Sequence, residues 1–217
     1  MRDPIPKRSV PWRLMLITDR LQAKRDLLEI IEESCVAGID AVQIREKDLS
    51  DKELMLLVQR AHKITRNHGV PLIVNNAVDV ALAAGADGVH LGGRSLPIDA
   101  ARRIVGDEML VGASTHDLEE VRVANQMGAD YLVFGPVFDT PSKQGVVSTT
   151  GLEPITELKR NTSIPIFALG GVKRANLAQI LSAGFDGAAA IGEIMAAEHP
   201  GQVVSELRAI AEEFALR

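Results

Sequence analysis

The sequence lacks the features that would place the chain in an oxidising compartment, in a membrane or on nucleic acid. It contains one cysteine among 217 residues, Cys35, so it has no disulfide framework, and we expect a reducing compartment, the cytoplasm. No apolar run reaches the length of a membrane span and no signal-peptide pattern occurs, so we expect no membrane contact. The formal net charge is −5 without a basic cluster, which argues against nucleic acid as a partner.

Two further absences concern the organisation of the chain. No linker or low-complexity stretch divides it, and the 46% of hydrophobic residues can form one sizeable core. The first residues contain Pro4, Pro6 and several charges. The sequence therefore predicts a loose tail over residues 1–11 and a single domain over residues 12–217.

What the chain does contain is one pattern written four times. Each copy has Ala or Met, then Gly, any residue, Asp and an apolar run, and the copies are 37–44 (AGIDAVQI), 84–91 (AGADGVHL), 127–134 (MGADYLVF) and 183–191 (AGFDGAAAI). Self-similarity of this kind indicates repeated architecture. Each copy is typical of a helix that ends at glycine and is followed at once by a buried strand.

Four more short apolar strands lie between the copies, which gives eight strands that alternate with helices. The predicted strands are 13–18, 40–45, 71–75, 87–91, 109–114, 130–134, 164–169 and 186–191. Eight such units in this length predict an α/β fold, a single (β/α)8 TIM barrel. A doubly wound open sheet is the alternative, but no GxGxxG turn follows the first strand.

In a barrel of this kind, functional residues lie at the carboxyl ends of the strands. After the second strand, alternation points Gln43, Arg45 and Lys47 in one direction. Two cations and an amide at one barrel mouth suit a polyanion such as a diphosphate. The alternative is a solvated edge of salt bridges.

Three further strand ends carry polar residues with two interpretations each. Asn75 and Asn76 suit a heterocycle, although Asn76 is also well placed to cap the next helix. Ser95 follows a glycine-containing loop that lets a ligand approach the backbone, but it also fits a plain helix start. We expect Ser114 to end its strand, and His116 is either a proton carrier or part of a helix start.

The last three loops suggest anion binding. The long loop after the sixth strand holds Thr140, Ser142 and Lys143, which are typical of a closing phosphate lid, with a disordered polar loop as the alternative. Glycines after the seventh and eighth strands with a helix start beyond are a common phosphate cradle in this fold, and here they are Gly170, Gly171 and Gly192.

Taken together, these segments resemble the thiamine phosphate synthase family, which includes a thiazole tautomerase branch. The resemblance spans nearly the whole chain and rests on QIREK (43–47), VNNAVDVALAAGADGVHLGG (74–93), FGPVFDTPSK (134–143) and ALGGV (168–172). It implies an enzyme that couples hydroxymethylpyrimidine diphosphate with thiazole phosphate to give thiamine phosphate and diphosphate.

The resemblance also implies a role for individual positions. The pyrimidine diphosphate side would be formed by Gln43, Arg45, Lys47, Asn75, Ser114 and Lys143. The thiazole phosphate side would be formed by Thr140, Ser142, Gly171, Ile191 and Gly192.

Two departures from the family concern Mg²⁺. Asn76 and Ser95 stand where the synthases have metal-binding aspartates, and Gly93 replaces a family glutamine. Because Mg²⁺ favours charged oxygen ligands, the resemblance implies a Mg²⁺ cofactor that these two neutral positions put in doubt. We therefore expect weak metal dependence.

Two alternative functions follow from these departures. The tautomerase branch also lacks the metal aspartates and is thought to use a histidine that matches His116, but it usually lacks the glutamine and lysine present here at Gln43 and Lys47. A non-catalytic binder of phosphorylated ligands is the other alternative. The sequence does not reveal the oligomeric state, and a homodimer is one assembly that it permits.

Overall fold

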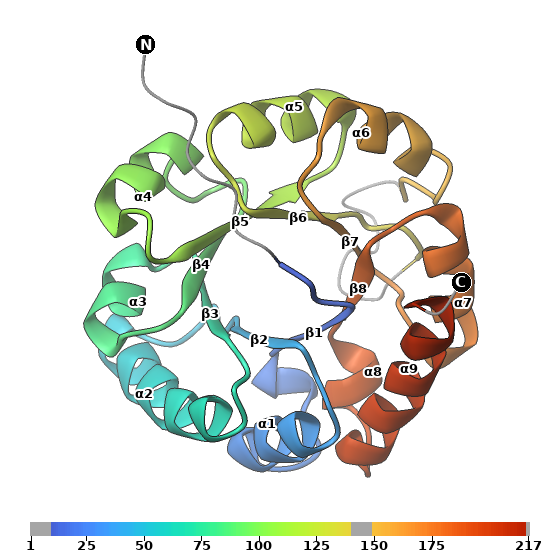
Figure 1. Cartoon of the computed structure of the whole chain (residues 1–217). Helices are drawn as coiled ribbons and strands as arrows, with labels where there is room; N and C mark the ends of the chain where they lie inside the picture. Colours follow the sequence, from blue (N-terminus) through green and yellow to red (C-terminus); the bar gives the residue numbers. More distant parts are fainter. Residues whose placement is uncertain (1–9, 140–148, 216–217) are drawn as a thin grey trace.

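The computed structural model describes residues 10–139 and 149–215, and their strands form a closed parallel barrel in the order β1 to β8 (Figure 1). The predicted fold is therefore confirmed. The strands are β1 (Leu14–Ile17), β2 (Ala41–Ile44), β3 (Leu72–Asn75), β4 (Gly88–Leu91), β5 (Leu110–Thr115), β6 (Tyr131–Phe134), β7 (Ile166–Leu169) and β8 (Gly187–Ala190). Seven of these lie within the predicted ranges, and β5 continues one residue past Ser114, which was expected to end it.

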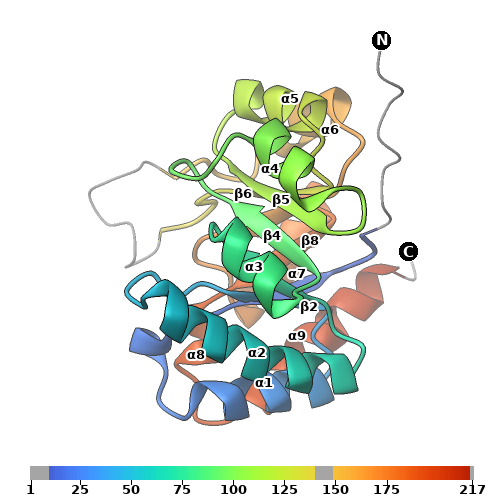
Figure 2. The ribbon, with the colours of Figure 1, turned by 90° about the vertical axis from the view of Figure 1, so that its left-hand side faces the viewer.

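Helices surround the ring of strands, and α2 and α3 run along its outer surface in the side view (Figure 2). They are η1 (Arg20–Gln22), α1 (Leu27–Val36), α2 (Asp51–Asn67), α3 (Val78–Ala84), α4 (Ile98–Val105), α5 (Leu118–Gln126), α6 (Ile155–Asn161), α7 (Arg174–Ala183), α8 (Gly192–Met195) and α9 (Pro200–Ala215). No helix of the described part of the chain is long and apolar enough to cross a membrane.

Alternation along the strands divides the apolar side chains into two layers. One set, which includes Val42 and Ile44, packs between the barrel and its helices. The other fills the barrel interior, where Trp12 lies edge-on to Tyr131 with ring centroids 5.2 Å apart. Val10 belongs to the same interior cluster and is buried. Large side chains therefore fill the barrel from its amino-terminal end and leave its carboxyl end for a site.

The aspartate of the fourfold pattern has a structural role that the sequence did not reveal. Each of the four carboxylates accepts a hydrogen bond from a backbone N–H at the start of the preceding strand. The bonds run from Leu14 to Asp40 (2.9 Å), from Leu72 to Asp87 (2.8 Å), from Val111 to Asp130 (2.7 Å) and from Ile166 to Asp186 (2.7 Å). The repeated Gly-x-Asp therefore fastens neighbouring strands together at the amino-terminal face, which serves stability rather than chemistry.

Asp130 carries the most buried of these contacts, and its removal is expected to destabilise the fold strongly. Its carboxylate also pairs with Arg102, and both side chains are almost fully buried. The change Asp130→Ala leaves the buried Arg102 guanidinium with backbone carbonyl partners but without a counter-ion, which costs about 3–5 kcal/mol. The matched change Asp186→Ala breaks a pair with Lys159 that is about one-third exposed, so its effect should be smaller. Urea unfolding measures both, and equal losses would contradict this ranking.

Candidate active site

A cavity of about 880 Å³ opens at the carboxyl ends of the strands. It collects most of the residues that the sequence singled out, namely Gln43, Arg45, Lys47, Asn75, Asn76, Ser114, His116, Gly170, Gly171, Ile191 and Gly192. Ser95 does not line the cavity but contacts Asn76, which does. Thr140, Ser142 and Lys143 lie outside the described residues, so the lid interpretation of their loop stays a prediction.

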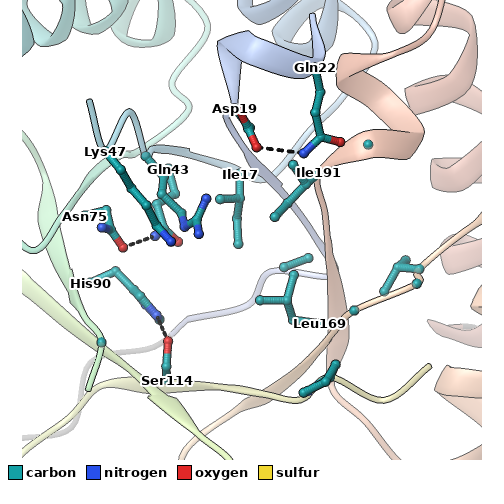
Figure 3. Close-up of a pocket in the computed structure, with 18 of the residues that line it drawn as sticks. Ile17, Asp19, Gln22, Gln43, Lys47, Asn75, His90, Ser114, Leu169 and Ile191 are labelled. Atoms are coloured by element: carbon teal, nitrogen blue, oxygen red, sulfur yellow. Dashed lines mark hydrogen bonds between the residues drawn. The ribbon is translucent and has the colours of Figure 1, made fainter. Parts of the chain in front are cut away.

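Two amides from neighbouring strands meet on one wall of the cavity. Gln43 Nε2 on β2 donates to Asn75 Oδ1 on β3 at 3.0 Å, and Figure 3 shows the pair beside Lys47. Gln43 is buried, and its Oε1 has no hydrogen-bond partner within the described residues. A buried carbonyl oxygen without a donor is costly, so this wall is suited to a ligand that brings an N–H group.

The positive charge of Arg45 lies half-buried in the same wall. Burial lowers the pKa of its guanidinium, while the nearby carboxylates of Asp19 and Glu46 oppose that shift. Glu46 accepts a hydrogen bond from the backbone N–H of Arg20 at 3.0 Å and also pairs with the Arg20 side chain. Glu46 therefore forms a salt bridge, as the alternative of a salt-bridged edge expects, although it lines the cavity together with Gln43, Arg45 and Lys47.

His90 on β4 joins the deep part of the cavity to the barrel interior. Its Nε2 lies 2.9 Å from Ser114 Oγ and its Nδ1 lies 3.3 Å from the hydroxyl of Tyr131 (Figure 3 shows the first contact). Burial, and secondarily the charge of Arg45, lowers the pKa of His90 to about 3. A neutral imidazole with one hydrogen to give is a hydrogen-bonding group here, which orients the Ser114 hydroxyl.

His116 lies at the rim and takes part in the start of α5. Its Nδ1 and its backbone N–H both contact Glu120 Oε2, at 3.0 and 2.7 Å. Asp117 is the N-cap of α5, and its side chain accepts from the backbone N–H of Glu120 at 2.8 Å. The structure shows His116 bonded to Glu120 in the first turn of α5, as the helix-start interpretation expects. His116 also lines the cavity.

Asn76 and Ser95 lie together but cap no helix. The N-cap of α3 is Ala77, so the capping interpretation of Asn76 is wrong. Helix α4 begins at Ile98 with Pro97 as its N-cap, so Ser95 does not start it either. Asn76 instead has a left-handed backbone with φ of 64°, a conformation that asparagine tolerates. Its Oδ1 accepts hydrogen bonds from Ser95 Oγ and from the backbone N–H of Gly92.

This donor set does not fit a Mg²⁺ ion held by the protein. Mg²⁺ requires several oxygen ligands in octahedral geometry and favours carboxylates, whereas Asn76 and Ser95 are neutral and already bonded to each other. Within the described residues, no group of three or more His, Cys, Asp or Glu side chains is arranged to hold a metal.

The predicted phosphate cradle lies on the opposite wall. Gly170 and Gly171 follow β7 with φ of 101° and 63°, which favour glycine, and Gly192 begins α8. Ile191 is the N-cap of α8. The first N–H groups of a helix have no carbonyl partner within it, so the backbone here can donate to an anion.

Several residues of the cavity were missed by sequence reasoning. Ile17, which is the register neighbour of Gln43 on β1, and Leu169 on β7 add apolar side chains to the cavity lining (Figure 3). Asp19 accepts a hydrogen bond from Gln22 Nε2 at 2.7 Å. His90 and Arg94 were within reach of the sequence, because alternation along β4 points His90 inward and Arg94 is in the loop that follows.

Comparisons with known proteins agree with the geometry. Residues 14–194 match the family model described as thiamine monophosphate synthase. A putative thiamine-phosphate synthase of Geobacter sulfurreducens is 42% identical over 203 residues, which cover 93% of this chain and 95% of that protein. The thiamine-phosphate synthase of Shouchella clausii is 39% identical over 94% of this chain and 98% of its own. Among solved structures, the thiamine phosphate pyrophosphorylase of Pyrococcus furiosus superposes with a TM-score of 0.86 at 35% identity, covering 94% of this chain and 97% of that one.

Proposed function

The chain belongs to the thiamine monophosphate synthase family, and we propose that it is the transferase that couples hydroxymethylpyrimidine diphosphate with thiazole phosphate in thiamine biosynthesis. The observation that carries the proposal is the division of the cavity into two walls. One wall combines an amide pair with Arg45 and Lys47, and the other combines glycine backbone with the start of α8. Two anionic heterocycles can therefore lie side by side.

On the first wall, we assign the pyrimidine to the amide pair and to Ser114. Gln43 Oε1 has no hydrogen-bond partner among the described residues and suits a ring amino group. His90 orients the Ser114 hydroxyl, which we assign to the same ring. Arg45 and Lys47 line the same cavity, and we assign to them the diphosphate carried by the pyrimidine methylene.

The reaction needs charge stabilisation more than proton transfer. The bond between the methylene carbon and the diphosphate oxygen breaks with its electron pair on the oxygen, and the thiazole nitrogen then forms the new bond to carbon. Arg45 and Lys47 stabilise the departing negative charge, a contribution that preorganised charges make effectively in a partly enclosed site. The apolar side chains of Ile17 and Leu169 limit water, which would otherwise capture the pyrimidine cation.

Two-ligand binding tests this function. Calorimetric titration of thiazole phosphate into protein saturated with inorganic diphosphate is expected to show binding with nearly unchanged affinity, because the two anions occupy opposite walls. Strict competition between the two would place both anions in one subsite and contradict the proposal.

The glycine wall gives a second test. A Cβ at Gly192 would meet only the flexible end of Gln22, at 2.9 Å, whereas a Cβ at Gly171 would meet the Cβ of Phe138 at 2.6 Å. Gly192→Ala is therefore expected to weaken thiazole phosphate binding by about tenfold by obstructing its approach, with little loss of stability. Gly171→Ala should destabilise the fold as well, so it cannot test binding alone. Unchanged affinity for thiazole phosphate in Gly192→Ala would show that the phosphate does not bind at this wall.

The isomerase alternative is not favoured by the comparisons. The relatives compared above carry the synthase name, and His116 is engaged with Glu120 at the start of α5. We place the enzyme in the cytoplasm on the basis of its single cysteine and the nature of its substrates.

A further inference from the structure

The arc of the cavity at the ends of β2, β3 and β4 is lined by two arginines, and no cluster of His, Cys, Asp or Glu among residues 10–139 and 149–215 is arranged there to hold a divalent cation. These three strands are neighbours in the barrel, and Arg45 follows β2, Asn76 follows β3 and Arg94 follows β4. All three residues line the cavity. Mg²⁺ is the cation that the family resemblance implies for this arc, and the neutral pair of Asn76 and Ser95 does not fit it.

Asn76 and Ser95 instead fasten the turn that carries Arg94. The backbone N–H of Ser95 donates to the Gly92 carbonyl at 2.9 Å, which closes a turn over residues 92–95. The Gly92 N–H donates to Ser95 Oγ at 2.8 Å and to Asn76 Oδ1 at 3.2 Å. Ser95 Oγ in turn donates to Asn76 Oδ1. Asn76, directly after β3, therefore fixes the turn over residues 92–95, and Arg94 lies within this turn.

The charge of Arg94 is not used elsewhere in the part of the chain that the structure describes. Its side chain is exposed at the cavity, and it forms no ion pair or hydrogen bond with any residue in 10–139 or 149–215. The acidic residues of the neighbouring β1–β2 side are engaged, since Asp19 accepts from Gln22 and both Glu46 and Asp48 pair with Arg20. The cavity residues contributed after β3 and by β4 and its loop include no carboxylate.

We infer that Arg94 binds the diphosphate group and supplies from the protein a positive charge for which the family otherwise uses Mg²⁺. The inference rests on the proposed function for the identity of the ligand. Two carboxylates at positions 76 and 95 would repel a diphosphate unless a dication lay between them. With Asn76 and Ser95 in their place and Arg94 beside them, this wall attracts the anion directly, and a guanidinium forms paired hydrogen bonds to phosphate oxygens.

Calorimetry with inorganic diphosphate on the full chain tests the inference. In EDTA the unaltered protein is expected to bind diphosphate. Adding Mg²⁺ should change this affinity by less than about threefold, because the neutral residues Asn76 and Ser95 provide no carboxylate ligands for the ion. Arg94→Gln should weaken binding in EDTA by about tenfold to a hundredfold, the loss expected for a charge-assisted contact. Arg94→Lys should recover part of it. The control Arg60→Gln removes an exposed arginine of α2 outside the cavity and should leave the affinity unchanged.

A double variant makes the comparison sharper. Asn76→Asp combined with Ser95→Asp is expected to weaken diphosphate binding in EDTA and to make binding depend on Mg²⁺. Diphosphate binding by the unaltered chain only with Mg²⁺, or an Arg94→Gln variant that binds as the unaltered chain does, would overturn the inference. A chain that binds diphosphate through Arg94 but forms no thiamine phosphate would instead refute the proposed function and leave the assignment of Arg94 standing.

Discussion

Replacing Arg45 by glutamine is expected to lower kcat/KM for thiamine phosphate formation by about a hundredfold to a thousandfold, the loss typical of removing a preorganised charge from a developing anion. Arg45 is half-buried at the cavity wall, and its backbone N–H is held by Thr18 Oγ1 at 3.0 Å. The backbone that carries the side chain is therefore fixed at the cavity wall, which limits the reorganisation needed when the diphosphate departs.

Steady-state kinetics with both substrates measure this effect. The Arg45→Lys variant keeps the charge but loses the planar fork, so it should show an intermediate kcat/KM. Arg60→Gln, on the exposed face of α2, is the matched control and should behave as the unaltered enzyme. Circular dichroism confirms that each variant is folded. If folded Arg45→Gln keeps its full kcat/KM, the leaving group does not lie against β2.

The second large effect concerns stability below neutral pH. Burial lowers the pKa of His90 to about 3 in the folded chain, whereas an unfolded histidine titrates near about 6.5. Between these two values the unfolded chain binds a proton that the folded chain does not. The contribution of His90 to stability is therefore complete above about pH 6.5 and falls by about 1.4 kcal/mol per pH unit as the pH drops toward 3.

Carboxylates also titrate in this range, so the effect of His90 is isolated by difference. Urea unfolding of the unaltered chain and of His90→Gln should be compared at several values between pH 7 and pH 4. The gap in unfolding free energy between the two proteins is expected to narrow as the pH falls, because only the unaltered chain loses the histidine contribution. Parallel curves would show that His90 takes up its proton with the same pKa in the folded and unfolded chains, and is therefore not held as the neutral group that orients Ser114.

The sequence predicted the barrel well because its signal was repeated. Each Gly-x-Asp copy combines a helix end with a buried strand, and a further short apolar strand lies between successive copies. Eight strands that alternate with helices are compatible with few topologies other than the barrel. The role of the aspartates was missed because a lone aspartate before a strand is usually a surface residue. Their fixed position before every second strand was the available signal, and it belongs to the stability of the amino-terminal face.

Site residues that lie on strands could be predicted from the alternation of side chains, whereas site residues positioned by turns could not. Gln43, Arg45 and Lys47 line the cavity as expected from the sequence. The strand period accounts for Gln43 alone, because β2 ends at Ile44 and Glu46 also lines the cavity. The mutual contact of Asn76 and Ser95 depends on the left-handed backbone of Asn76 and on the turn over residues 92–95, neither of which has a period in the sequence. The position of Arg94 in the loop after β4 placed it near the site, but its role depends on this same turn and could not be predicted. The roles assigned to Thr140, Ser142 and Lys143 stay predictions.

The measurement that tests the central claim most directly is the rate of thiamine phosphate formation from hydroxymethylpyrimidine diphosphate and thiazole phosphate, followed by chromatography in EDTA and across a Mg²⁺ titration. The same samples are analysed for isomerisation of the thiazole. We expect thiamine phosphate to form only when both substrates are present, with diphosphate released in equal amount and with a rate that depends weakly on Mg²⁺. Thiazole isomerisation that is abolished in His116→Gln, with no thiamine phosphate at any Mg²⁺ concentration, would contradict the account and place the chain's activity in the tautomerase branch.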